Sequence, residues 1–207
     1  MCRQLLVLSV MIMLILANYS SVFACACCAD KGEYSISTGK PDSYLLSEFT
    51  KMRFAKLATL FTSDAGIEKN QVKGLPKDYN EENYQANFDK LSVEGGYRNN
   101  QWKFSLTDYQ GRKGDLILPK TVAFVRFAVD LEPDNPAPNH SLYKEWRFQG
   151  NIKATGFLSS SITTNTKYFL VFRGNGNACD NASDFDYWRL EIKGSKASYA
   201  FWGKMEK

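Results

Sequence analysis

Cysteine is the residue type in this sequence with the greatest chemical potential, and its spacing is uneven. The 207-residue chain has five cysteines, three of them in Cys25-Ala26-Cys27-Cys28 and one far along the chain at Cys179. In an oxidising compartment these four are expected to form disulfides that fasten the N-terminal segment to the loop around Cys179. Cys27 or Cys28 is the expected partner of Cys179, because a bridge between adjacent cysteines is strained.

The same cluster allows two other interpretations. Thiolates of Cys25, Cys27 and Cys28 suit a soft ion such as Cu(I) or Zn(II), which would make the chain a thiol-based metal-binding or redox protein. Their spacing differs from the Cys-x2–4-Cys pairs of structural zinc sites. Cys25 also follows Val22-Phe23-Ala24, a degenerate lipobox, so lipidation of Cys25 is a further alternative. Apart from copper or zinc at these thiols, no cofactor is expected.

The N-terminus has the pattern of a secretory signal peptide. Arg3 precedes an apolar run over residues 5–17, and a polar stretch then leads to Val22-Phe23-Ala24, with small residues at the two positions that signal peptidase inspects. The run is shorter than the roughly twenty residues that a membrane-spanning helix needs. We therefore expect cleavage after Ala24, with cleavage after Ala26 as the second choice. Cleavage after Ala24 also removes Cys2 and leaves four cysteines. The mature chain is expected to be secreted, periplasmic or part of the cell envelope, with no transmembrane segment.

A second concentration of polar residues lies near Cys179. Asp180, Asp184 and Asp186 could offer oxygen ligands to Ca²⁺, although their spacing matches no EF-hand and such residues are common in long hairpin connections. Asn139 and Asn181 each begin an Asn-x-Ser glycosylation sequon, which is relevant in a eukaryotic host.

No residue set identifies a reaction, so no catalytic residue is assigned. His140 is the only histidine, and no nucleophile elbow or phosphate-binding glycine loop is present. An envelope enzyme that acts on glycans or lipids through scattered carboxylates is a weaker alternative. The formal net charge of +4 is too small to indicate a nucleic-acid partner.

Alternation with a period of two dominates the chain from about residue 43 and predicts strands. The longest alternating run covers residues 146–158, and turns are expected at Gly95-Gly96 and Gly174-Asn-Gly176. Further strands are expected over residues 44–49, 52–61, 88–93, 102–106, 115–118, 121–129, 168–172, 187–193 and 197–202. We therefore predict an all-β, single-domain antiparallel β-barrel or β-sandwich of about 8–10 strands with at most one short helix.

The predicted organisation has three parts. Residues 1–24 are the signal peptide, 25–42 a cysteine-containing N-terminal segment, and 43–207 one β domain. A polar insertion covers residues 62–87, where Asn80 has the pattern of a helix cap.

Aromatic and basic residues on the expected strands are the remaining candidates for binding. Trp102, Trp146 and Trp188 lie on apolar faces and are expected in the core, whereas Trp202 is expected to be exposed or to line a cavity. Basic residues occupy the polar faces and would line a barrel interior, form an anion-binding face or be simply solvated: Arg147, Lys153, Arg173, Arg189 and Lys193. The leading interpretation is a non-enzymatic binding or interaction protein with an unknown extracellular or envelope ligand.

Overall fold

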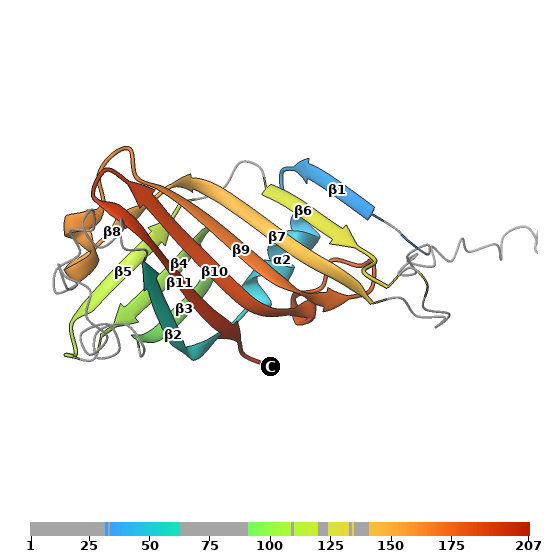
Figure 1. Ribbon diagram of the computed structural model, residues 1–207, viewed down its shortest axis with the longest axis horizontal. Coiled ribbons are helices and arrows are strands. Elements are labelled where there is room, and N and C mark those ends of the chain that lie inside the picture. Colours follow the sequence, from blue (N-terminus) through green and yellow to red (C-terminus); the bar gives the residue numbers. More distant parts are fainter. Residues whose placement is uncertain are drawn as a thin grey trace, which may run out of the picture.

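The computed structural model describes residues 32, 34–62, 91–108, 110–119, 124–132, 134 and 141–207. Its elements are mainly strands that join into one sheet (Figure 1). In chain order the elements are β1 (Tyr34–Gly39), α2 (Ser43–Lys51), β2 (Phe54–Thr62), β3 (Leu91–Arg98), β4 (Gln101–Thr107), β5 (Lys113–Leu118), β6 (Phe124–Val129), β7 (Leu142–Asn151), β8 (Lys153–Ala154), the 3-10 helix η1 (Gly156–Ser161), β9 (Lys167–Gly176), the 3-10 helix η2 (Ala182–Asp184), β10 (Phe185–Gly194) and β11 (Ala197–Met205).

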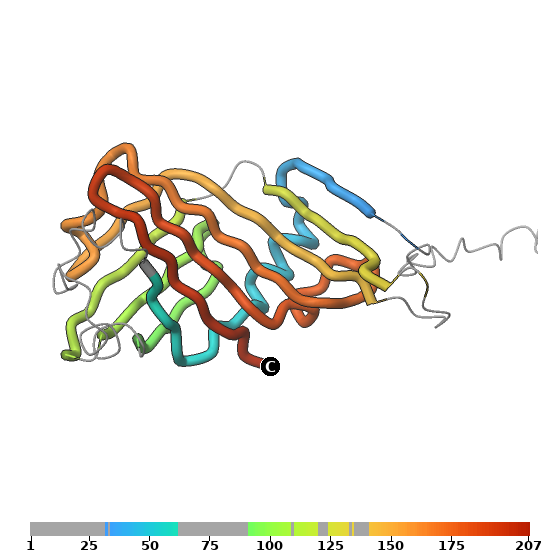
Figure 2. The backbone as a smooth tube through the Cα atoms, in the orientation of Figure 1, coloured from blue at the N-terminus to red at the C-terminus, as the bar shows by residue number. Residues whose placement is uncertain are grey.

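All strand pairs are antiparallel, in the order β1-β6-β7-β9-β10-β11-β2-β3-β4-β5-β8. The sheet curls into a half-barrel, with the long strands β7, β9, β10 and β11 side by side (Figure 2). The predicted all-β antiparallel class is confirmed. The sheet has eleven strands: nine of the ten predicted ranges contribute a strand, β1 is added, and the two-residue β8 is a second strand within the predicted run 146–158. No helix in the described part of the chain is long and apolar enough to cross a membrane.

The concave side of the sheet holds the core, which α2 helps to fill. Trp102, Trp146 and Trp188 are fully buried, as predicted. Phe49 of α2 lies among five rings, at centroid distances of 5.1–5.8 Å from Tyr97, Trp102, Phe124, Trp146 and Phe148. Full burial of one such ring stabilises the fold by roughly 1.5–3 kcal/mol, so α2 is fixed against the sheet.

The strand predicted over residues 44–49 is wrong, because this segment forms α2. Asp42 caps the helix, and its side chain accepts a hydrogen bond from the Leu45 amide at 2.8 Å. Leu45, Glu48 and Phe49 are the buried residues, at the spacing of one helix face. The short apolar run is compatible with the period of a strand and with that of a helix, and the Asp42 cap stabilises the helix.

The two predicted glycine turns also lie within strands. Gly95 is inside β3 at a φ of +145°, and a Cβ there would lie 2.0 Å from the Lys103 carbonyl oxygen. Gly174 is inside β9, where a Cβ would lie 1.9 Å from the Asp184 carbonyl oxygen. These glycines therefore permit close backbone approach within the sheet and do not reverse the chain.

The predicted run over residues 146–158 is interrupted. β7 ends at Asn151, β8 is short, and Leu158 is buried within η1. Residues 1–24 and most of the predicted insertion, including Asn80, lie outside the described residues.

Candidate functional site

Of the aspartates predicted as calcium ligands, Asp180 and Asp184 lie in the connection between β9 and β10 and Asp186 lies at the start of β10, and each has a basic partner. The three ion pairs are Asp180 with Arg126 at 2.7 Å, Asp184 with Lys144 at 2.6 Å, and Asp186 with Lys207 at 2.6 Å. Within the described residues, no three His, Cys, Asp or Glu side chains are grouped so that they could hold a metal ion. The carboxylates thus point to separate cations instead of converging on one ion site.

Lys144 is the most buried of these cations, with 3% of its surface exposed. Its ammonium group donates to Asp184 and to the Cys179 carbonyl oxygen, and it lies 5.9 Å from the centre of the Phe185 ring. Burying an ammonium group is costly unless it is paired and hydrogen-bonded. These contacts therefore fix the β9–β10 connection to the inner side of β7.

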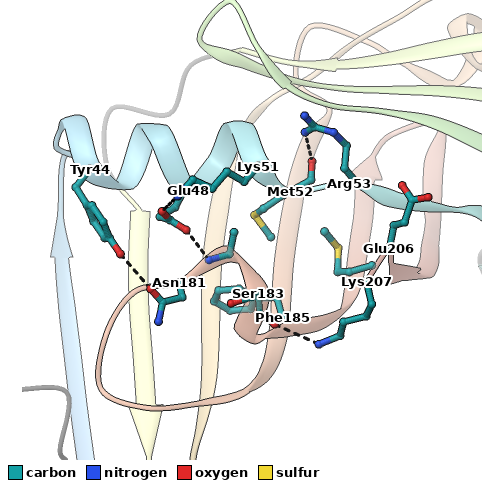
Figure 3. A pocket seen from close by; sticks show the side chains of 12 residues that line it. Tyr44, Glu48, Lys51, Met52, Arg53, Asn181, Ser183, Phe185, Glu206 and Lys207 are labelled. Atoms are coloured by element: carbon teal, nitrogen blue, oxygen red, sulfur yellow. Dashed lines mark hydrogen bonds and ion pairs between the residues drawn. The ribbon is translucent and has the colours of Figure 1, made fainter.

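A pocket of about 560 Å³ lies where α2, the η2 segment and the C-terminal residues meet (Figure 3). We call it the α2 pocket. Met52, Phe185 and Met205 give it apolar lining, and charged groups surround them. Its volume is in the range of small-molecule sites. A ligand is expected there only if the polar groups that line the pocket are free to bind it.

Most polar groups of the α2 pocket already bond to one another, as the dashed lines in Figure 3 indicate. Glu48 accepts a hydrogen bond from the Ala182 amide at 2.9 Å and pairs with Lys51. Tyr44 donates to Asn181 at 3.1 Å. Burial alone would raise the pKa of Glu48, but the amide and Lys51 outweigh it, so this pKa lies below its ordinary value. The pocket is chiefly a junction that holds η2 against α2.

The other predicted site residues are divided between described and undescribed parts of the chain. Asn181 is half-buried at this junction, and Asn139 and His140 lie outside the described residues. Cys179 is not a free thiol. Its pairing, the lipidation of Cys25 and the thiol-based metal or redox interpretation stay predictions, because the N-terminal cysteines are not described.

The convex side of the sheet carries guanidinium groups over aromatic rings. The Arg147 guanidinium lies 5.1 Å from the centre of the Phe127 ring, and that of Arg173 lies 5.7 Å from Tyr187. Tyr187 stacks in turn on Trp202, with ring centres 5.1 Å apart and planes 23° apart. Such contacts hold the cations and rings in fixed positions while leaving them open to solvent.

Two hollows adjoin on this side over β10 and β11, and together we call them the β10–β11 groove. Their volumes are about 400 Å³ and 210 Å³, and both are lined by Phe61, Arg189 and Ala200. Ala200 lies in register between Glu191 and Phe61, so the absence of a longer side chain leaves space between larger neighbours. At about 3.3 Å per residue, the four steps from Trp202 to Ser198 make the groove roughly 13 Å long.

Cations outnumber carboxylates along the groove. Among the described residues that line the two hollows, Arg173, Arg189 and Lys193 face one carboxylate, that of Glu191, which leaves an excess of two positive charges. Glu191 pairs with Arg189 at 2.6 Å and with Lys193 at 2.8 Å. Within the described residues, Arg173 forms no ion pair. Its exposed guanidinium is therefore available to an anion from solution.

The sequence located only part of this groove. Trp202 lines the first hollow, in agreement with its expected place beside a cavity, and Arg173 and Arg189 lie on the convex side and not in a barrel interior. Lys153 lies apart, on β8. Phe61 was missed, because its position depends on the pairing of β2 with β11. No local signal reports a pairing between strands so distant in sequence.

Comparison with known proteins adds no identity to this geometry. No protein-family model, curated protein or solved structure matches the chain. The function is therefore argued from the groove itself.

Proposed function

We propose that this protein is a non-enzymatic binding protein that holds an elongated ligand in the β10–β11 groove. The observation that carries the proposal is a pair of adjoining hollows that share Phe61, Arg189 and Ala200 and combine accessible rings with an excess of cations. Phe61 is 46% exposed, and the side chain of Arg189 is 56% exposed. Exposed aromatic and arginine side chains are the groups that most often dominate binding surfaces.

Binding fits the groove better than catalysis does. Acid–base chemistry needs a positioned proton donor or acceptor that is available to the substrate. Glu191, the one carboxylate among the described lining residues of the groove, is held by Arg189 and Lys193. The α2 pocket fits less well as a ligand site, because its main polar contacts connect α2 to η2.

We further propose that the protein acts outside the cytoplasm, as a secreted, periplasmic or envelope protein. The apolar run over residues 5–17 and the small residues before Cys25 support this location. A disulfide from Cys179 to Cys27 or Cys28 would suit the same compartment.

Filling the groove tests the binding proposal. Ala200→Ile adds bulk at a strand position that suits a β-branched residue, so the fold is expected to persist. We expect at least a tenfold loss of binding on an array of neutral and acidic polysaccharides and peptides. Thr107→Ile is the matched control, since Thr107 is a half-buried residue on β4 and lines neither hollow.

Thermal unfolding of both variants is measured alongside, so that a folding defect is not mistaken for a loss of binding. The proposal fails if Ala200→Ile binds as well as the native chain, or if the native chain binds none of the polysaccharides and peptides on the array.

A further inference from the structure

We infer that the ligand of the β10–β11 groove is an acidic polysaccharide, which carries carboxylate or sulfate groups on its sugars. This inference rests on the proposed function and adds the class of ligand. It depends on three properties of the groove: the presence of guanidinium groups beside rings, the lack of free backbone, and the unpaired cation at the Trp202 end.

The first hollow combines two kinds of contact. Arg173 and Arg189 line it together with Trp202 and Phe61. A guanidinium group binds carboxylate or sulfate through two parallel hydrogen bonds. The rings offer apolar surface to the C–H groups of a sugar ring, as aromatic side chains do for other apolar partners. A sugar acid presents both features on one unit.

The backbone beneath the groove is already paired, which argues against an extended peptide. β10 pairs with β9 and β11, and β11 pairs with β10 and β2. Extended peptides commonly bind by adding a strand to an exposed sheet edge, where main-chain groups are free. In this groove only side chains can recognise the ligand. A polysaccharide does not depend on hydrogen bonds to the protein main chain, so it suits such a surface better.

The unpaired positive charge lies at the Trp202 end of the groove. Arg189 and Lys193 both pair with the Glu191 carboxylate, at 2.6 Å and 2.8 Å, so their charged groups lie close together and are partly neutralised. Arg173 lines the first hollow together with Trp202 and forms no ion pair within the described residues. An anionic group of the ligand is therefore expected beside Arg173, and the sugar ring that carries it beside Trp202.

The test compares four soluble polymers by biolayer interferometry with the full chain. Hyaluronan carries a carboxylate on alternating sugars, polygalacturonate carries one on every sugar, dextran is neutral, and poly-glutamate is an acidic peptide. We expect hyaluronan and polygalacturonate to bind more tightly than dextran and poly-glutamate, with at least tenfold weaker binding in 0.5 M NaCl than in 0.05 M NaCl, because exposed charges are screened.

Two variants and one control assign that binding to groove residues. Arg173→Gln and Trp202→Ala are each expected to weaken hyaluronan binding at least tenfold. Arg98→Gln removes the same charge from an exposed position on β3 outside both hollows, and it should bind like the native chain. Arg173→Gln keeps the test decisive if Trp202→Ala fails to fold.

The outcomes separate this inference from the proposed function. The ligand class would be overturned, while Ala200→Ile still blocked the groove, by dextran binding as tightly as the acidic polysaccharides, by tighter binding of poly-glutamate, or by native affinity in Arg173→Gln. If Ala200→Ile changed nothing, the groove itself would be excluded and both proposals would fall together.

Discussion

Two charged regions of the molecule differ in how their charges are balanced. At the β9–β10 connection, Lys144 and Asp184 are almost enclosed and pair at 2.6 Å. Along the β10–β11 groove, Arg189 and Lys193 share the Glu191 carboxylate, Arg173 forms no ion pair within the described residues, and all three cations remain accessible. Buried charges must be matched or the fold becomes unstable, whereas exposed charges can stay unmatched at little cost. A local excess of exposed charge is therefore a better indication of a ligand than a cluster of charged residues in sequence.

The largest expected effect comes from breaking the buried pair. Lys144→Ala leaves the Asp184 carboxylate without its ammonium partner, and the loss of a buried partner typically costs about 3–5 kcal/mol. We expect a decrease of that size in the free energy of unfolding in urea. Lys153→Ala, at an exposed position on β8, serves as the control. A decrease below about 1 kcal/mol would contradict the assignment of Lys144 to stability, because surface substitutions commonly have effects this small.

Glu48→Gln should have the next largest effect. The substitution removes the negative charge of the carboxylate that accepts a hydrogen bond from the Ala182 amide and pairs with Lys51. A hydrogen bond to a charged group contributes about 1.5–3 kcal/mol to stability. Urea unfolding measures the loss, with Glu94→Gln on the exposed part of β3 as the control. Binding by the folded variant should be unchanged. Weaker groove binding at unchanged stability would show that the α2 junction takes part in ligand recognition.

The pH dependence of stability provides a third comparison. The pKa of Glu48 is below its ordinary value of 4.5, since the Ala182 amide and Lys51 outweigh the effect of burial. The unfolded chain thus binds a proton more readily than the native one, and stability falls as the pH drops below about 4.5.

Asp115 contributes in the same direction. Burial raises the pKa of Asp115, but the combined effect of Ser105, Lys103 and Thr155 is larger, so this pKa lies below its ordinary value.

Urea unfolding between neutral and acidic pH should show a shallower decline in the free energy of unfolding for Glu48→Gln than for the native chain. Parallel declines would indicate that Glu48 has the same pKa in both states.

The smallest effect on stability is expected from Arg173→Gln, which removes a groove cation. Its guanidinium contacts the Tyr187 ring and has no ion pair within the described residues, so the free energy of unfolding should change by no more than about 0.5 kcal/mol. The same variant is expected to lose ligand binding. A stability loss comparable to that of Lys144→Ala would remove the distinction between the two regions.

Much of the fold follows from local pattern, and the exceptions have physical reasons. Alternation identified the buried faces of Trp102, Trp146 and Trp188, because side chains of a strand alternate between its two sides. It failed at residues 44–49, where a short apolar run fits a strand or a helix and the Asp42 cap decides. It also failed at Gly95, whose close approach to Lys103 depends on the neighbouring strand.

The candidate site was less predictable than the fold. The acidic cluster near Cys179 suggested calcium, but its partners Arg126, Lys144 and Lys207 come from three distant parts of the chain. Sequence spacing cannot report such ion pairs. Trp202 and the basic residues were visible as exposed positions, yet their arrangement as one surface was not.

By itself the sequence determined the antiparallel β class and the three core tryptophans, since these depend on periodicity and apolar character along short segments. It also supplied the expectations of secretion and disulfides. The tertiary structure alone decided which charges are neutralised and where a hollow remains. Phe61, Ala200 and Glu191 become neighbours only through the register of β2, β11 and β10. That register is set by the packing of the whole sheet, because a shift of one residue would move every side chain to the opposite face.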